Sequence, residues 1–187
     1  MKDVRFTHVV DPPLAEDELT ALTADHAHVP GLCDFYATSG AVALFFDAAS
    51  KESAYYIGPP SQWHVFRDGL FGWFEGLTQA EEKQLLPAWV DDSYVLGTIP
   101  GSGNYLVVPG TGEESGAVFL FDHDGFEFLK LAETLPAFVA EACNPGDEAL
   151  TSIATGMRFV ECESDDEQWW IVELRNDFDE VVASTHT

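Results

Sequence analysis

The chain has 187 residues, of which 46% are apolar and 13% aromatic, and it carries 33 acidic residues against 8 lysines and arginines. This apolar content is enough for a hydrophobic core and excludes a globally disordered chain, and the length favours one domain. The formal net charge of -25 repels nucleic-acid phosphates and anionic lipids and attracts basic proteins, although an acidic surface can also serve solubility alone.

The sequence has no basic and apolar leader typical of a signal peptide. It also has no uninterrupted run of about 18 apolar residues, the length that a membrane-spanning helix requires. We therefore expect a cytoplasmic protein that binds neither membrane nor nucleic acid.

Two helices are expected near the N-terminus. Asp11 precedes two prolines and an acidic turn, a pattern that predicts a helix from Pro12 to about Leu22. Pro30 begins a second helix with an apolar stripe, and Gly40 is expected to end it in the left-handed conformation.

A hairpin and two further helices are expected next. The runs 41–47 and 53–57 are rich in β-forming residues and predict the two strands of the hairpin. Apolar residues recur at helical spacing over residues 61–76, which predicts an amphipathic helix despite two glycines. Thr78 and Glu81 have the spacing of a capping box, which indicates another short helix.

An antiparallel meander follows in residues 94–121. Three strand-length apolar runs (Tyr94 to Ile99, Tyr105 to Val108 and Ala117 to Phe121) are separated by two breaks (Pro100 to Asn104 and Pro109 to Gly116). The breaks hold the glycine, proline, asparagine and serine that reversing turns require.

The remaining elements complete an α+β domain. A fourth strand is expected at 126–129 and a helix capped by Thr134, then a helix after Asn144 and a hairpin of 157–163 and 168–174. We expect a single domain whose antiparallel-rich sheet, of about six strands, is covered by helices on one side. Residues 1–143 form this domain, and residues 144–187 are an extension packed on it.

The central block resembles the SUKH superfamily, which includes yeast cell-wall-assembly regulators and immunity proteins of bacterial polymorphic toxin systems. The resemblance covers roughly residues 28–143. It rests on Gly97, on the small residues Gly101 to Asn104 before the strand Tyr105 to Val108, on Gly116, and on Phe121-Asp122-His123-Asp124-Gly125.

Asp122, His123 and Asp124 are residue types that bind metals, and a metal-dependent hydrolase is one hypothesis for the chain. In a strand, however, the two carboxylates share one face while the imidazole lies on the other. We therefore predict no bound metal and no cofactor, and a structural turn in which the aspartates accept backbone N–H groups and Gly125 adopts a positive φ.

Five aromatic residues lie close together along the chain: Trp63, Phe71, Trp73, Phe74 and Trp89. They predict packing on a broad sheet face, with the alternative that one or two form an exposed anchor for a partner, since tryptophan dominates interface hot spots.

The resemblance implies a non-enzymatic cytoplasmic immunity protein that neutralises a cognate toxin domain. The acidic charge points to a basic partner such as a nuclease domain. An intracellular regulator or scaffold, as in the eukaryotic branch of the family, is the alternative from the same family. Acidic density and aromatic content select the candidate partner-binding residues Asp165, Asp166, Glu167, Trp169, Glu113 and Glu114.

Overall fold

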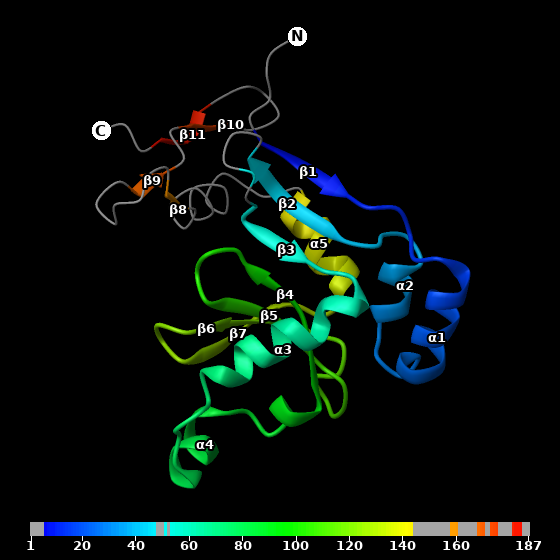
Figure 1. Ribbon diagram of the computed structural model, residues 1–187, viewed down its shortest axis with the longest axis vertical. Helices are drawn as coiled ribbons and strands as arrows, with labels where there is room; N and C mark the ends of the chain where they lie inside the picture. The colour runs from blue at the N-terminus through cyan, green and yellow to red at the C-terminus, as the bar shows by residue number, and fades with distance from the viewer. Residues whose placement is uncertain are drawn as a thin grey trace.

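The computed structural model describes residues 6–47, 51 and 53–143, together with the backbone of four short strands beyond them. Seven antiparallel strands form one sheet in the order in which they follow one another along the chain (Figure 1). They are β1 (Phe6–Val10), β2 (Val42–Asp47), β3 (Tyr55–Ile57), β4 (Ser93–Ile99), β5 (Asn104–Pro109), β6 (Val118–Asp122) and β7 (Glu127–Ala132). The α+β fold with one main antiparallel sheet is confirmed, and β1 is the strand of this sheet that the sequence did not predict.

The central strands bury side chains on both faces of the sheet. In β5, Leu106 and Val108 belong to one core cluster and Val107 belongs to the other. Successive side chains of a strand point to opposite faces, so a continuous apolar run needs cover on both. The expectation that helices cover only one side is therefore wrong.

The first face is covered by α1 (Glu16–His26), α2 (Leu32–Tyr36) and α5 (Leu135–Cys143). Phe35 and Tyr36 of α2 and Phe138 of α5 are buried there with apolar side chains of β2 to β6. The predicted cap of α5 is present, since Thr134 Oγ1 accepts the Ala137 N–H at 3.3 Å.

The second face is covered by α3 (Trp63–Gly72), which follows the 3-10 turn η1 (Pro60–Gln62) and lies across β4 and β5 (Figure 1). Leu70 and Phe74 are buried against this face. Glycine is unfavourable inside a helix, but the structure explains its presence at position 69. A Cβ on Gly69 would overlap the Tyr105 hydroxyl. The glycine thus lets the helix backbone approach β5 closely.

Between α3 and β4 lie α4 (Gln79–Leu85) and a second 3-10 turn, η2 (Val90–Asp92). The predicted capping box of α4 is confirmed: Thr78 Oγ1 accepts the Glu81 N–H at 3.4 Å, and Glu81 Oε2 accepts the Thr78 N–H at 2.8 Å. The Thr78 hydroxyl also donates to Glu81 Oε2 at 2.7 Å, and this hydrogen bond, with the one from the Thr78 N–H, lowers the pKa of the Glu81 carboxyl.

The start of α1 lies later in the chain than predicted. Asp11 continues the pairing of β1 with the segment just before β2. Its N–H donates to the Ala41 carbonyl at 2.8 Å, and its own carbonyl accepts the Gly40 N–H at 3.1 Å. The helix consequently begins at Glu16 and not at Pro12. Gly40 does not have the predicted left-handed conformation; it is needed because a Cβ there would overlap the Pro12 carbonyl.

Beyond residue 143 the described backbone forms two small hairpins. β8 (Arg158–Val160) pairs with β9 (Gln168–Trp170), as predicted, whereas β10 (Glu173–Arg175) pairs with β11 (Val181–Ser184), a strand that the sequence did not predict. The predicted helix after Asn144 and the side chains of these strands lie outside the described residues.

The position of Gly97 against the neighbouring strand generates a stability prediction. A Cβ on Gly97 in β4 would overlap the Tyr56 carbonyl of β3, whereas a Cβ on Gly72 of α3 would meet no atom within 4 Å. We expect Gly97→Ala to lower the free energy of unfolding by about 2 kcal/mol or more, because two paired backbones must separate. Gly72→Ala, the matched control, should raise it by up to about 1 kcal/mol, because alanine restricts the unfolded chain. Urea unfolding of both variants measures the difference, and equal midpoints would contradict the prediction.

Candidate partner-binding surface

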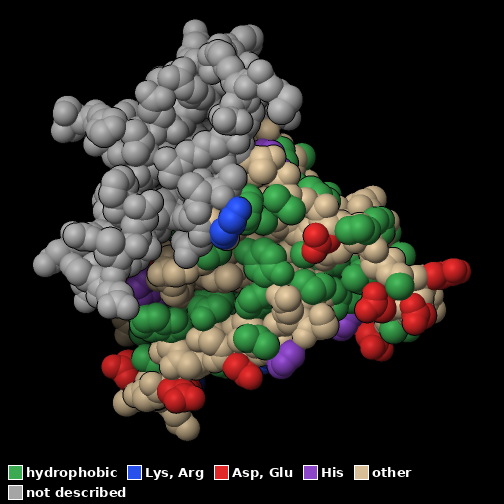
Figure 2. All heavy atoms as spheres, turned by 45° about the horizontal axis from the view of Figure 1, so that its top comes forward, with side chains coloured by type: hydrophobic (Ala, Val, Ile, Leu, Met, Phe, Trp, Pro, Cys, Tyr) green, Lys and Arg blue, Asp and Glu red, His purple; other side chains and the backbone are tan. Residues whose placement is uncertain are grey.

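The outward side of α3 is a stripe of exposed residues. Ser61, Val65, Asp68 and Gly72 are all exposed and recur at the spacing that places helical residues on one side. Trp73 follows at the C-terminal end of the helix with 42% of its surface exposed. We call these five residues the α3 stripe. Figure 2 shows one face of the molecule, on which carboxylate side chains stand around exposed apolar ones.

Trp73 is exposed but not loosely held. Its ring packs on the His123 ring with a centroid distance of 4.8 Å and an interplanar angle of 40°. Gly103 lies beneath it, where a Cβ would come within 3.0 Å of the indole. The tryptophan from α3 is therefore supported by the β4–β5 and β6–β7 turns.

One oxygen, Asn104 Oδ1, contacts both the backbone and the ring of His123. This oxygen accepts the backbone N–H of His123 at 3.0 Å and lies 2.7 Å from its ring Nδ1. An amide oxygen can only accept, so Nδ1 carries a hydrogen and donates to it. The orientation of the imidazole, and of the tryptophan on it, follows from this pair of bonds.

Asp122 and Asp124 occupy the turn after β6. The predicted structural turn is confirmed, because Asp122 Oδ1 accepts the Asp124 N–H at 3.2 Å. The predicted positive φ of Gly125 is wrong; Phe126 has the positive value, 54°. Phe126 packs on Phe121 and Phe74, contacts that hold it in this unusual conformation.

The geometric argument against a shared metal ligand set is also wrong. β6 ends at Asp122, and the turn brings ligand atoms of Asp122, His123 and Asp124 within 4.8 Å of one another. His123 Nε2 lies 3.2 Å from Asp124 Oδ1, an ion pair whenever the imidazole is protonated. The pocket described below is lined by none of the three residues.

Of the partner-binding residues chosen from the sequence, Glu113 and Glu114 lie among the described residues. Glu114 is already used within the protein: Lys130 Nζ binds its carboxylate at 2.8 Å and that of Glu133 at 2.9 Å, and these contacts raise the pKa of Lys130. Glu113 is exposed in the β5–β6 loop. Asp165, Asp166 and Glu167 lie outside the described residues, as does the side chain of Trp169 in β9.

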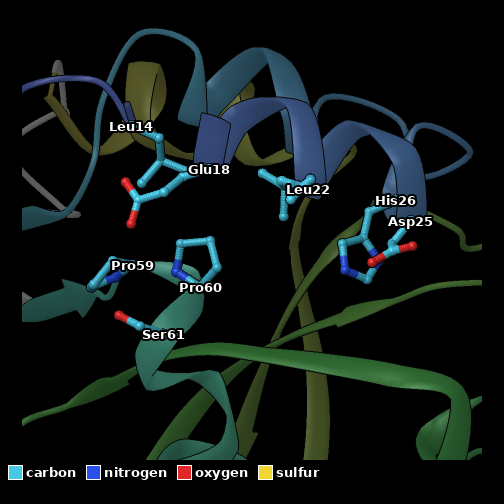
Figure 3. Close-up of a pocket in the computed structure, with 9 residues that line it drawn as sticks. Leu14, Glu18, Leu22, Asp25, His26, Pro59, Pro60 and Ser61 are labelled. Carbon is cyan, nitrogen blue, oxygen red and sulfur yellow. The ribbon is translucent and has the colours of Figure 1, made fainter. Parts of the chain in front are cut away.

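A pocket of about 250 Å³ lies between α1 and η1 (Figure 3). Its lining was not found by sequence reasoning, because the residues come from two segments with no common motif. Both segments contribute apolar and polar residues to the lining. The apolar residues are Leu14, Ala21, Leu22, Pro59 and Pro60, and the polar residues are Glu18, Asp25, His26 and Ser61.

The η1 side of this pocket is anchored by Tyr36. The buried Tyr36 hydroxyl donates to the Gly58 carbonyl at 2.6 Å and accepts the indole N–H of Trp63 at 3.1 Å. Burial raises the pKa of Tyr36 far above its ordinary value, so the hydroxyl stays protonated and remains a donor. Residues before and after Pro59-Pro60 are thereby tied to the core.

No protein-family model matches the chain, and no curated protein matches its sequence. Among the helices of the described residues, none is long and apolar enough to cross a membrane.

We predict that folding needs no metal, because backbone and side-chain hydrogen bonds already close the Asp122–Asp124 turn. The melting temperature of protein purified without chelator should be unchanged in excess chelator, and elemental analysis should find no stoichiometric metal. Metal at one equivalent, whose removal lowers the melting temperature by several degrees, would overturn this prediction and favour the hydrolase hypothesis.

Proposed function

We propose that this chain is a non-enzymatic binding protein of the cytoplasm that neutralises a basic toxin domain, as SUKH immunity proteins do. The observation that carries the proposal is Trp73: an exposed tryptophan held in place by His123 and Asn104, with carboxylates nearby in the sequence and in the turn beneath it. Exposed aromatic side chains that are already ordered lose little entropy on binding and dominate interface energies.

The charge of the chain supports a basic partner. The formal net charge is -25, and two of the few cations are engaged internally: Lys130 by two glutamates, and Arg67 by the carbonyl oxygens of Ser93 and Asp91 at 2.9 and 3.0 Å. A strongly acidic surface accelerates encounter with a basic protein and repels nucleic acid.

The α3 stripe is the surface that we propose for this contact, in place of the residues chosen from the sequence. It combines one carboxylate, Asp68, with the apolar side chains of Val65 and Trp73. Carboxylates steer association, while desolvated aromatic groups supply the affinity.

Trp73→Ala tests the anchor. The proposed role requires a toxin domain encoded next to this chain. Co-expression with such a domain should allow growth with the unchanged protein, and the substitution should weaken the purified complex about 30-fold or more, as loss of a hot spot does. Leu129→Ala is the matched control, since Leu129 is 45% exposed, close to the value for Trp73. It pairs with Leu120, which packs on the face of the sheet opposite α3. The Leu129→Ala protein should bind the toxin domain with unchanged affinity. The melting temperatures of both variants should show that each is folded. Absence of both protection and complex formation would reject the immunity function; equal affinities of the two variants would reject this surface.

The electrostatic part is tested by association kinetics. The screening length is about 8 Å at physiological ionic strength, so the association rate should fall steeply with added salt while dissociation changes little. Asp68→Lys should slow association more than Glu141→Lys does. Both substitutions change the charge equally, but Glu141 is exposed on α5, which covers the face of the sheet opposite α3. An association rate that does not depend on salt would contradict electrostatic steering but not the immunity function.

A further inference from the structure

The pocket between α1 and η1 lies at the N-terminal end of the α3 stripe. Ser61 belongs to both, and Pro59 and Pro60 face Leu14 and Glu18 of the α1 side across the pocket (Figure 3). Because Ser61 is exposed and lines the pocket, a partner that covers the N-terminal end of the α3 stripe also reaches the edge of this pocket.

The interior of the pocket is suited to the methylene stem of a long side chain. The lining includes the buried side chain of Leu22 and two proline rings. Proline rings are rigid, and Tyr36 and Trp63 anchor the segment that carries them. A side chain that enters loses contact with water without requiring the walls to rearrange.

The polar groups of the lining favour a cation. Glu18 and Asp25 supply carboxylates on the α1 side, and the lining includes no lysine or arginine. Glu18 Oε2 also accepts the Ala15 N–H at 3.3 Å, which holds this carboxylate in position at the start of α1.

His26 does not oppose a cation in the pocket. Burial lowers its pKa below the ordinary value, with Asp25 acting in the opposite direction and His28 in the same one. Its Nδ1 lies 3.1 Å from the Tyr94 hydroxyl, and its ring packs on Tyr94 and Trp63. Burial therefore favours the neutral imidazole, whose ring forms an aromatic part of the lining.

We infer that this pocket receives the side chain of an arginine from the basic partner, an inference that rests on the proposed function. The guanidinium is planar and weakly hydrated, so it lies against proline and imidazole faces while its N–H groups reach a carboxylate. Lysine carries a more strongly hydrated charge and has no such flat surface.

The test uses blocked amino acids as probes of the full chain. N-acetyl-arginine amide is titrated into ¹⁵N-labelled protein at low salt, with N-acetyl-citrulline amide as a neutral ligand of nearly the same shape. We expect saturable shifts of the backbone amides of Glu18, Ala21, Asp25, His26 and Ser61 with the arginine probe, and none that saturate with the citrulline probe.

Two pairs of variants separate the pocket from the general acidity of the chain. Glu18→Gln and Asp25→Asn should each weaken binding of the arginine probe by up to about fivefold, as expected for an exposed ion pair. Glutamine retains the capping acceptor at position 18. Glu16→Gln and Asp17→Asn are the matched controls, since they remove charge from the same helix outside the pocket lining, and they should leave binding unchanged.

Equal binding of the citrulline probe, shifts spread over the whole surface, or equal losses in both pairs of variants would overturn the inference. These outcomes are independent of any toxin. If the toxin complex forms and protects but the arginine probe does not bind, only the inference about the pocket is rejected. If the probe binds specifically but no toxin complex forms, the proposed function is rejected.

Discussion

The organising constraint of this protein is that the central strands of its sheet are apolar on both faces. Leu106, Val107 and Val108 are consecutive and almost completely buried, and this is possible only if helices cover both sides. Burial of one valine or leucine contributes about 1.5–3 kcal/mol, so a sheet with one bare face loses a large part of its stability. α1, α2 and α5 meet this requirement on one face, and α3 meets it on the other.

The position of α3 determines where the candidate surface lies. Its inner side chains, Leu70 and Phe74, are held by the sheet, and Gly69 allows the helix to lie close to β5. The opposite side is left facing solvent, and the C-terminal end reaches the turn that contains His123. The rigid exposed tryptophan is thus a consequence of how the second face is covered, and Pro59 and Pro60, just before the same helix, line a pocket with residues of α1.

Some features remained hidden because they depend on the tight packing of backbone segments. Gly40 and Gly69 read as a helix end and a helix defect, yet both are sites where another part of the chain comes too close for a Cβ. Likewise, Asp122, His123 and Asp124 cannot share one side of a strand, but the strand ends at Asp122. A difference of one or two residues in an element boundary reverses a prediction about which side chains converge.

The sequence by itself determined the α+β class, the β2–β3 hairpin, the meander of β4 to β7, the capping box of α4 and the cap of α5, because these depend on apolar periodicity and turn residues close together in the chain. Only the tertiary structure decided that both faces are covered, that β1 joins the sheet, and that Asn104 orients His123 beneath Trp73. The pocket likewise joins residues 14–26 to residues 59–61. Such contacts are set by how helices pack on a twisted sheet, and no local pattern in the sequence encodes them.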